Sequence, residues 1–136
     1  MIEFFNEDID YTPPTPHALK TWIQQVVSLE QYQLGDLNYI FCSDPYLLEI
    51  NRKYLDHDYH TDIITFDLSE NDDQIAGDIF ISVDRIRENA QSFQVEEHQE
   101  LQRVMVHGVL HLMGYDDKDA DQKLEMRKKE EDYLSL

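Results

Sequence analysis

The chain is poor in cysteine, in long apolar runs and in basic residues, and each shortage narrows the class of protein. Cys42 is the only cysteine among 136 residues, so no disulfide can form within the chain and a reducing compartment is expected. No apolar stretch approaches the ~20 residues of a membrane-spanning helix. Residues 1–7 contain glutamates and no basic residue, which is not the pattern of a signal peptide. These absences predict a cytoplasmic protein with no membrane partner.

Basic residues are strongly outnumbered, with 11 Lys and Arg against 29 Asp and Glu and a net charge of -18. Nucleic-acid-binding proteins normally carry basic patches, because contacts with phosphates supply much of their affinity. Composition alone therefore argues against a nucleic-acid partner. At most a small basic rim is expected, and the candidates for it are Arg52, Lys53, Arg85, Arg87 and Arg103.

The pattern of apolar residues predicts one α+β domain over residues 1–136, which is long enough for a hydrophobic core. We expect one small mixed four-stranded sheet with about five helices packed on it. Thr15 is the expected cap of the first helix and Gly35 its end, while Cys42 is expected to be buried. The last helix is expected to have a thin apolar face of Leu124, Tyr133 and Leu134, with residues 127–132 as a solvated, charged face. The strands are expected at 2–5, 37–42, 62–67 and 77–82, and the helices at 15–35, 44–55, 84–93, 96–113 and 119–134.

The segment from His107 to Asp117 has the clearest chemical pattern. His107 and His111 are four residues apart in an apolar, helical run, so both imidazoles lie on one face of a helix. Gly114 tolerates the left-handed geometry that ends helices, so the chain can turn back and bring Asp116 or Asp117 toward the same ion. Two imidazoles and one carboxylate make a three-ligand site that leaves room for water or substrate, as in catalytic zinc sites. The sequence therefore predicts a metal site near the end of a late helix.

Several functions are compatible with such a site. Gly108 stands where the His-Glu-x-x-His helix of metalloproteases carries its general base, which disfavours that route to peptide hydrolysis. Without a side chain at Gly108, another segment or a substrate can approach the helix closely. The open alternatives are hydrolysis by a metal-bound water, a non-haem oxygenase-type site, and a non-enzymatic binding protein with a structural ion. A fourth protein ligand, such as His57 or His60, would favour the last of these.

Residues 107–116 resemble the signature of the YbeY-type endoribonucleases, the bacterial rRNA maturation factors, which runs His-Gly-x-Leu-His-Leu-x-Gly-Tyr-Asp-His. Residues 61–66 are similar to the family's Thr-Asp-Val-Leu-Ser-Phe strand, and residues 77–82 to its Gly-Asp-Ile-x-Ile-Ser strand. The resemblance implies a four-stranded sheet with the metal helix packed against it. It also implies a metal-dependent hydrolase, a single-strand-preferring endoribonuclease that acts in rRNA maturation and ribosome quality control.

The resemblance further implies a ligand set of His107, His111 and Asp117 around one ion. Zn²⁺ is the expected metal, with Mn²⁺, Fe²⁺ or Ni²⁺ as alternatives because Asp117 replaces the family's third histidine with a harder oxygen donor. The expected partners are rRNA, contacted transiently, and the ribosome or ribosome-associated proteins, with no DNA partner.

Arg52 and Asp116 are the expected catalytic residues beside the ligands. Leu55 stands where members of the family usually carry an arginine, and Arg52 lies one helical turn earlier, where it can replace that arginine at the scissile phosphate. Asp116 either orients a ligand, the usual task of a carboxylate next to a metal site, or caps the turn.

Overall fold

The computed structural model of the protein describes residues 1–55 and 61–136, and for Leu55 only the backbone. One four-stranded sheet runs through it in the order β1-β2-β4-β3. β1, β2 and β4 are parallel, and β3 pairs antiparallel with β4 at the edge. The small mixed sheet expected from the sequence is therefore confirmed. The strands are β1 (Ile2–Asn6), β2 (Gln33–Cys42), β3 (Ile63–Asp67) and β4 (Gln74–Ser82).

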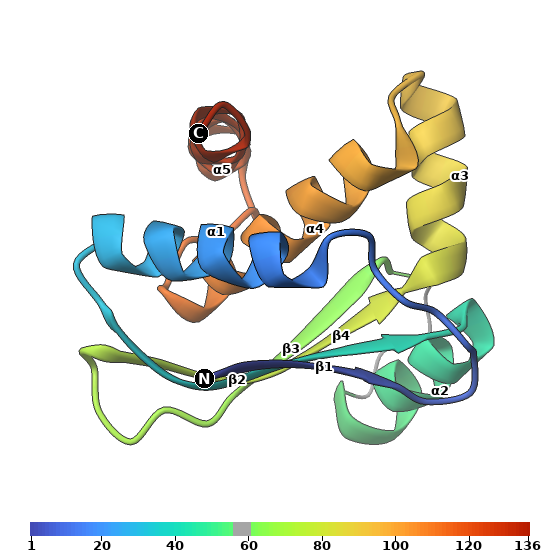
Figure 1. Cartoon of the computed structure of the whole chain (residues 1–136), viewed down its shortest axis with the longest axis horizontal. Helices are drawn as coiled ribbons and strands as arrows, with labels where there is room; N and C mark the ends of the chain where they lie inside the picture. Colours follow the sequence, from blue (N-terminus) through green and yellow to red (C-terminus); the bar gives the residue numbers. More distant parts are fainter. Residues whose placement is uncertain (56–60) are drawn as a thin grey trace.

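Five helices occur in the described residues, as the sequence predicts. α1 and α4 cover one face of the sheet, and α2 lies on the opposite face (Figure 1). α3 and α5 both pack against α4, so α5 forms an outer layer that is separated from the sheet (Figure 1). None of the helices within residues 1–55 and 61–136 combines the length and the hydrophobicity of a membrane-spanning segment. The helices are α1 (Pro16–Leu29), α2 (Asp44–Leu55), α3 (Val83–Phe93), α4 (Glu97–Leu112) and α5 (Ala120–Leu134).

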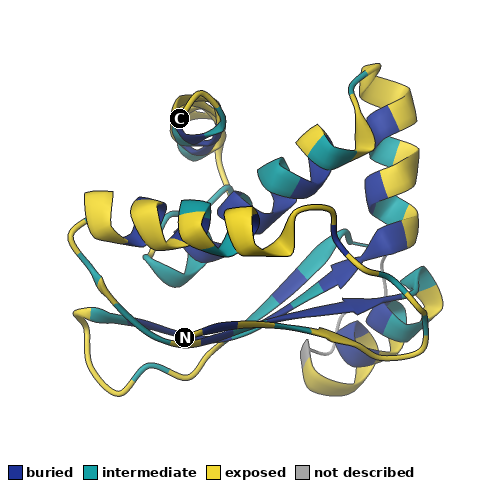
Figure 2. Ribbon diagram, viewed as in Figure 1, coloured by how far each residue is buried: buried dark blue, intermediate teal, exposed yellow. Residues whose placement is uncertain are grey.

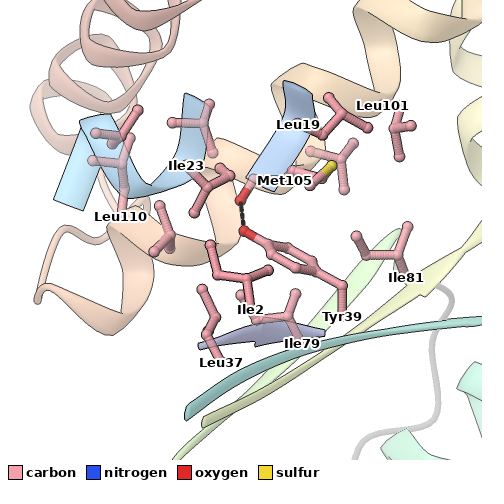
Figure 3. Packing of buried hydrophobic residues seen from close by; sticks show 14 of the residues in the cluster. Ile2, Leu19, Ile23, Leu37, Tyr39, Ile79, Ile81, Leu101, Met105 and Leu110 are labelled. Carbon is pink, nitrogen blue, oxygen red and sulfur yellow. Dashed lines mark hydrogen bonds between the residues drawn. The ribbon is translucent and has the colours of Figure 1, made fainter. Parts of the chain in front are cut away.

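The larger hydrophobic core lies between the sheet and the helices α1 and α4, where the buried faces of both layers meet (Figure 2). Tyr39 of β2 is fully buried there, and its hydroxyl donates a hydrogen bond to the Met105 carbonyl of α4 at 2.9 Å (Figure 3). A smaller cluster under α2 contains Cys42. Burial raises the pKa of the Cys42 thiol to about 12, so this cysteine is an inert core residue, as expected.

Gly108 sets how closely α4 approaches the sheet. A Cβ atom at this position would lie 2.6 Å from Cδ1 of Ile63 and 3.0 Å from Cγ2 of Ile79. The sequence predicts that either another segment or a substrate can approach the helix at Gly108. The structure shows that side chains of β3 and β4 do so. This contact seats the helix that carries both motif histidines directly on the sheet.

Two expectations about α1 are wrong. The helix ends at Leu29 rather than at Gly35, because Gln31 takes the left-handed conformation with φ of 66° and β2 already begins at Gln33. Gly35 lies inside β2, where the register with β4 shifts. Thr15 has φ of 44° and its side chain forms no capping hydrogen bond, so Pro16 in the first turn is the feature that starts the helix.

The contact between Tyr39 and Met105 generates a stability prediction. Tyr39→Phe removes a buried hydrogen bond that links β2 to α4, and we expect it to lower the free energy of unfolding by about 1 kcal/mol. Urea denaturation followed by circular dichroism measures this value. The same change at Tyr54, which is 61% exposed, is the matched control and should leave stability unchanged. Equal effects of the two substitutions would contradict the assignment.

Candidate metal centre

Three potential metal ligands converge at the C-terminal end of α4. The Nε2 atoms of His107 and His111 are 3.0 Å apart. Oδ2 of Asp117 lies 3.6 Å from Nε2 of His107 and 3.7 Å from Nε2 of His111. In the described part of the chain this is the group of side chains that could hold a metal ion, with all donor atoms within 4.8 Å of one another. The structure thus brings together the three residues that the sequence proposed as ligands.

The turn after α4 carries Asp117 back to the histidines. Gly114 has φ of +101°, the left-handed region that the sequence led us to expect there. The Tyr115 amide donates to the Leu110 carbonyl at 3.1 Å, which closes the end of the helix. The Asp117 amide then donates to Oδ1 of Asp116 at 2.9 Å. Asp116 therefore shapes the turn that presents the third ligand.

Glu130 of α5 holds His107 in place. Its side chain is nearly buried, and Oε2 lies 2.6 Å from Nδ1 of His107. Because a carboxylate only accepts hydrogen bonds, Nδ1 carries the proton and the Nε2 lone pair faces Asp117 and His111. Carboxylates commonly orient metal-binding histidines in this way. The sequence predicts a solvated, charged face over residues 127–132, so it does not identify Glu130 as part of the site.

The expectation for the apolar face of α5 is also corrected by the structure. Met126 and Tyr133 are buried, whereas Leu124 is 68% exposed. The face of α5 that packs on α4 therefore contains Met126, Glu130 and Tyr133. A glutamate at a buried helix position is not expected from hydrophobic periodicity, which explains why the pattern did not reveal it.

Arg103 balances the buried charges behind His107. Its guanidinium lies 3.3 Å from Oε1 of Glu130, and it forms hydrogen bonds of 2.8 and 2.5 Å with Glu100, which is 1% exposed. Asp62, just before β3, lies 3.6 Å away. Buried charges are tolerated when they are paired and hydrogen-bonded in this way. Arg103 thus joins α4, α5 and the start of β3 behind the ligands.

The local environment favours a metal-binding form of His111. Burial lowers the pKa of His111, the neighbouring His107 lowers it further, and Asp117 and Asp116 oppose the shift. The neutral imidazole is the form that ligates metals. For Asp116, the hydrogen bond from the Asp117 amide lowers the pKa of the carboxyl, so this group stays ionised.

A second carboxylate, Glu30 at the end of α1, fixes the position of α5. Its side chain is 9% exposed and accepts hydrogen bonds from Tyr115 at 2.7 Å, from Lys129 at 3.0 Å and from the Tyr133 hydroxyl. The indole of Trp22 also donates to the Tyr133 carbonyl at 2.9 Å. These bonds tie α1 to α5 and to the turn between Gly114 and Asp117.

Arg52 and most of the expected basic rim do not line the cavity at the metal centre. Arg52 is on α2, pairs with Glu49 at 3.0 Å, and is not among the residues that line the cavity at the metal centre. The expected basic rim does not form there: of its five candidates only Arg103 lines this cavity, and carboxylates surround it. His57 and His60 lie outside the described residues, as does the Leu55 side chain.

The donor set fits a divalent transition metal. Two imidazole nitrogens and one carboxylate oxygen form a three-ligand set of the kind found in catalytic sites, and Glu130 aims one of those nitrogens. Asp117 is 42% exposed, and both it and His107 line a cavity of about 320 Å³. Fold and site together define an α+β protein with a candidate metal centre that opens onto a cavity.

Comparisons with known proteins agree with this class. The family model described as Endoribonuclease YbeY matches residues 3–136. A protein named Endoribonuclease YbeY from Cytophaga hutchinsonii is 52% identical over 99% of this chain and 94% of its own, and one from Amoebophilus asiaticus is 47% identical over 98% and 90%. A solution structure of a Thermotoga maritima protein superposes with a TM-score of 0.70 at 30% identity, covering 99% of this chain and 87% of that one. The chain belongs to the YbeY endoribonuclease family.

The contact between Glu130 and His107 predicts an effect on metal affinity. We expect Glu130→Gln to weaken metal binding by about 10- to 100-fold, because the neutral amide orients the imidazole less firmly than the carboxylate does. Competition with a chromogenic chelator measures the change. The exposed neighbour Glu131 provides the control, since Glu131→Gln removes the same charge without touching His107. Identical metal affinities in the two variants would refute the positioning role.

The Glu30 cluster predicts a pH-dependent contribution to stability. Burial raises the pKa of the Glu30 carboxyl, but hydrogen bonds from Tyr133, Tyr115 and Lys129 outweigh it and leave the pKa below its ordinary value of 4.5. The carboxylate therefore stabilises the fold above about pH 4.5, and this contribution is lost as the pH falls through the lowered pKa.

We therefore expect Glu30→Gln to lower the free energy of unfolding at pH 7 by about 2 kcal/mol, and by less in acid. Denaturant titrations between pH 3 and about 8 measure the difference. Glu125→Gln, at an exposed position of α5, is the control and should show little change at any pH. A difference between Glu30→Gln and the native protein that grows on acidification would contradict the assignment.

Proposed function

We propose that the protein is a metal-dependent endoribonuclease that cuts single-stranded RNA during rRNA maturation and ribosome quality control. The observation that carries the proposal is the convergence of His107, His111 and Asp117, within the family's signature segment, beside a cavity large enough for part of a nucleotide chain. The curated relatives at 52% and 47% identity are named as endoribonucleases.

The proposed chemistry divides between a bound cation and the side chains around it. A divalent cation at this site supplies Lewis acidity, which lowers the pKa of a bound water and polarises a phosphodiester oxygen. His107 and His111 offer nitrogen donors, and Glu130 keeps the His107 proton on Nδ1, away from the ion. Asp116 holds the turn so that the Asp117 carboxylate completes the set. Arg52 remains a sequence-based candidate for phosphate binding, to which the described geometry adds no support.

Zn²⁺ is the metal that we propose for the site. Tetrahedral zinc sites with two histidines, one carboxylate and one open position occur among hydrolases. Asp117 in place of a third histidine gives a harder donor set, which keeps Mn²⁺, Fe²⁺ and Ni²⁺ as alternatives. The proposed partners are rRNA and the ribosome or its associated proteins in the cytoplasm. With a net charge of -18 the protein is expected to contact RNA weakly and transiently outside the site.

The two alternative functions of the site have less support than RNA hydrolysis. An oxygenase-type function is not favoured, because the family match and the named relatives point to RNA hydrolysis. The other alternative, a ribosome-associated binding protein with a structural ion, calls for a fourth protein ligand. The group contains three among residues 1–55 and 61–136, and the candidate fourth ligands His57 and His60 lie outside these ranges.

Removal of one ligand tests the proposal. We expect His107→Ala to lose the bound metal and to reduce cleavage of a single-stranded RNA by more than about 100-fold, since losing a ligand costs more than losing its supporting hydrogen bond. Elemental analysis of the purified protein and a cleavage assay on fluorescent RNA and on structured rRNA, with and without chelator, measure both effects. His17→Ala, at an exposed histidine of α1, is the control. Full cleavage by a metal-free variant would exclude the scheme.

A further inference from the structure

The cavity beside the metal centre has a volume of about 320 Å³ and is lined partly by α5. Two basic residues of α5, Lys123 and Arg127, are part of this lining. His107 and Asp117 contribute ligands to its wall, so whatever occupies it lies next to the proposed ion. The lining residues are Arg103, His107, Asp117, Lys123, Leu124, Met126, Arg127 and Glu130.

Lys123 and Arg127 are the two cations of this cavity whose charges are not matched by a carboxylate in the described ranges. Both side chains are exposed, and neither forms an ion pair or a side-chain hydrogen bond with a residue in the described ranges. Arg103, the third cation of the lining, is already surrounded by Glu100, Glu130 and Asp62. The charges of Lys123 and Arg127 are therefore available to an anionic ligand, whereas the charge of Arg103 is used within the fold.

Most cations elsewhere on the described surface are already engaged. Arg85 pairs with Asp44 at 3.1 Å and Arg87 pairs with Glu97 at 3.4 Å. The ammonium groups of Lys20 and Lys53 lie over aromatic rings at 5.1 and 5.4 Å. In a chain with 29 acidic residues, two cations at the metal cavity that have no ion pair with residues 1–55 or 61–136 are therefore unusual. An exposed pair of this kind repels other cations and attracts anions.

Helix geometry gives the pair a defined spacing. Lys123 and Arg127 are four residues apart, so they lie on one face of α5 and about 6 Å apart along its axis. Two long cationic side chains at this spacing can each contact one of two neighbouring phosphates of a nucleic-acid strand. Leu124 also lines the cavity and is 68% exposed, which offers an apolar surface to a ribose or a base.

The charge of the lining also favours a phosphate chain. Arg103 pairs with Glu130 within the fold, so Lys123 and Arg127 outnumber the one remaining carboxylate of the lining, Asp117, even before a metal ion adds its own charge. The cavity is thus locally positive in a molecule whose net charge is -18. A polyanion would therefore be attracted to this cavity and repelled by most of the remaining surface.

We propose that Lys123 and Arg127 bind the phosphates that flank the scissile bond of a single-stranded RNA, and so hold the strand along α5 with one phosphodiester at the metal centre. This inference rests on the proposed function and assigns substrate contacts within it. It places the phosphate-binding cations on α5, at the cavity beside the three ligands. Phosphate contacts of this kind position a strand without reading its sequence.

The salt dependence of RNA binding tests this assignment. The variants are Lys123→Gln, Arg127→Gln and the double variant, each loaded with metal. Binding of a fluorescent, phosphorothioate-substituted single-stranded RNA that resists cleavage is followed by anisotropy over a series of salt concentrations. Each lost phosphate contact should reduce the slope of log K against log salt by about 0.7, so the double variant should lose about 1.4.

Lys128→Gln is the matched control, because Lys128 is exposed on the same helix but does not line the cavity. We expect it to keep the native slope, and we expect all variants to retain the native metal content, since none of these residues is a ligand. Equal slopes in all variants, or a native protein that binds no RNA, would overturn the assignment. Reduced slopes in a protein that binds but cleaves no RNA would support the strand contacts while the proposed function fails.

Discussion

The hydrogen bond between Glu130 and His107 is the contact on which the candidate site depends. It joins α5 to α4 at 2.6 Å and fixes the tautomer of the imidazole, so that Nε2 is left for a ligand. It also explains why a charged residue is buried in the outermost helix of the fold. Because Arg103 pairs with the same carboxylate, the site is backed by a charge network that is closed within the described residues. The network adds polar contacts between α5 and α4 to the hydrogen bonds that tie α5 to the end of α1, and α5 forms one wall of the cavity.

Three kinds of support hold the ligands in place. The close approach at Gly108 seats α4 on β3 and β4, which fixes the helix that carries both histidines. The left-handed Gly114 and the Asp116 carboxylate shape the turn that returns Asp117 to them. Glu30 then ties that turn and α5 to the end of α1 through Tyr115, Tyr133 and Lys129. The sheet, the turn and the outer helix therefore each position a different part of one site.

The local part of this site could be predicted from the sequence, and the long-range part could not. His107, His111, Gly114 and Asp117 lie within eleven residues, where helix and turn geometry predict that the two imidazoles meet and that Asp116 or Asp117 approaches them. The family resemblance singles out Asp117 of these two carboxylates. The role of Glu130 could not be predicted, because its burial depends on how α5 docks on α4. Its charged neighbours in the sequence predict a solvated face instead. The arrangement of the expected basic rim could not be predicted for a similar reason. Ion pairs such as that between Arg85 and Asp44 form between residues far apart in the sequence. The end of α1 was misplaced because Gln31, not a glycine, adopts the left-handed conformation.

The most direct test of the account is a crystal structure of the zinc-loaded protein, with the ion located by anomalous scattering at the zinc edge. The account predicts one ion bound by Nε2 of His107, Nε2 of His111 and the Asp117 carboxylate, while Glu130 keeps its hydrogen bond to Nδ1 of His107. An ion bound through Nδ1 of His107 with Glu130 turned away, or zinc found only at other sites, would contradict it.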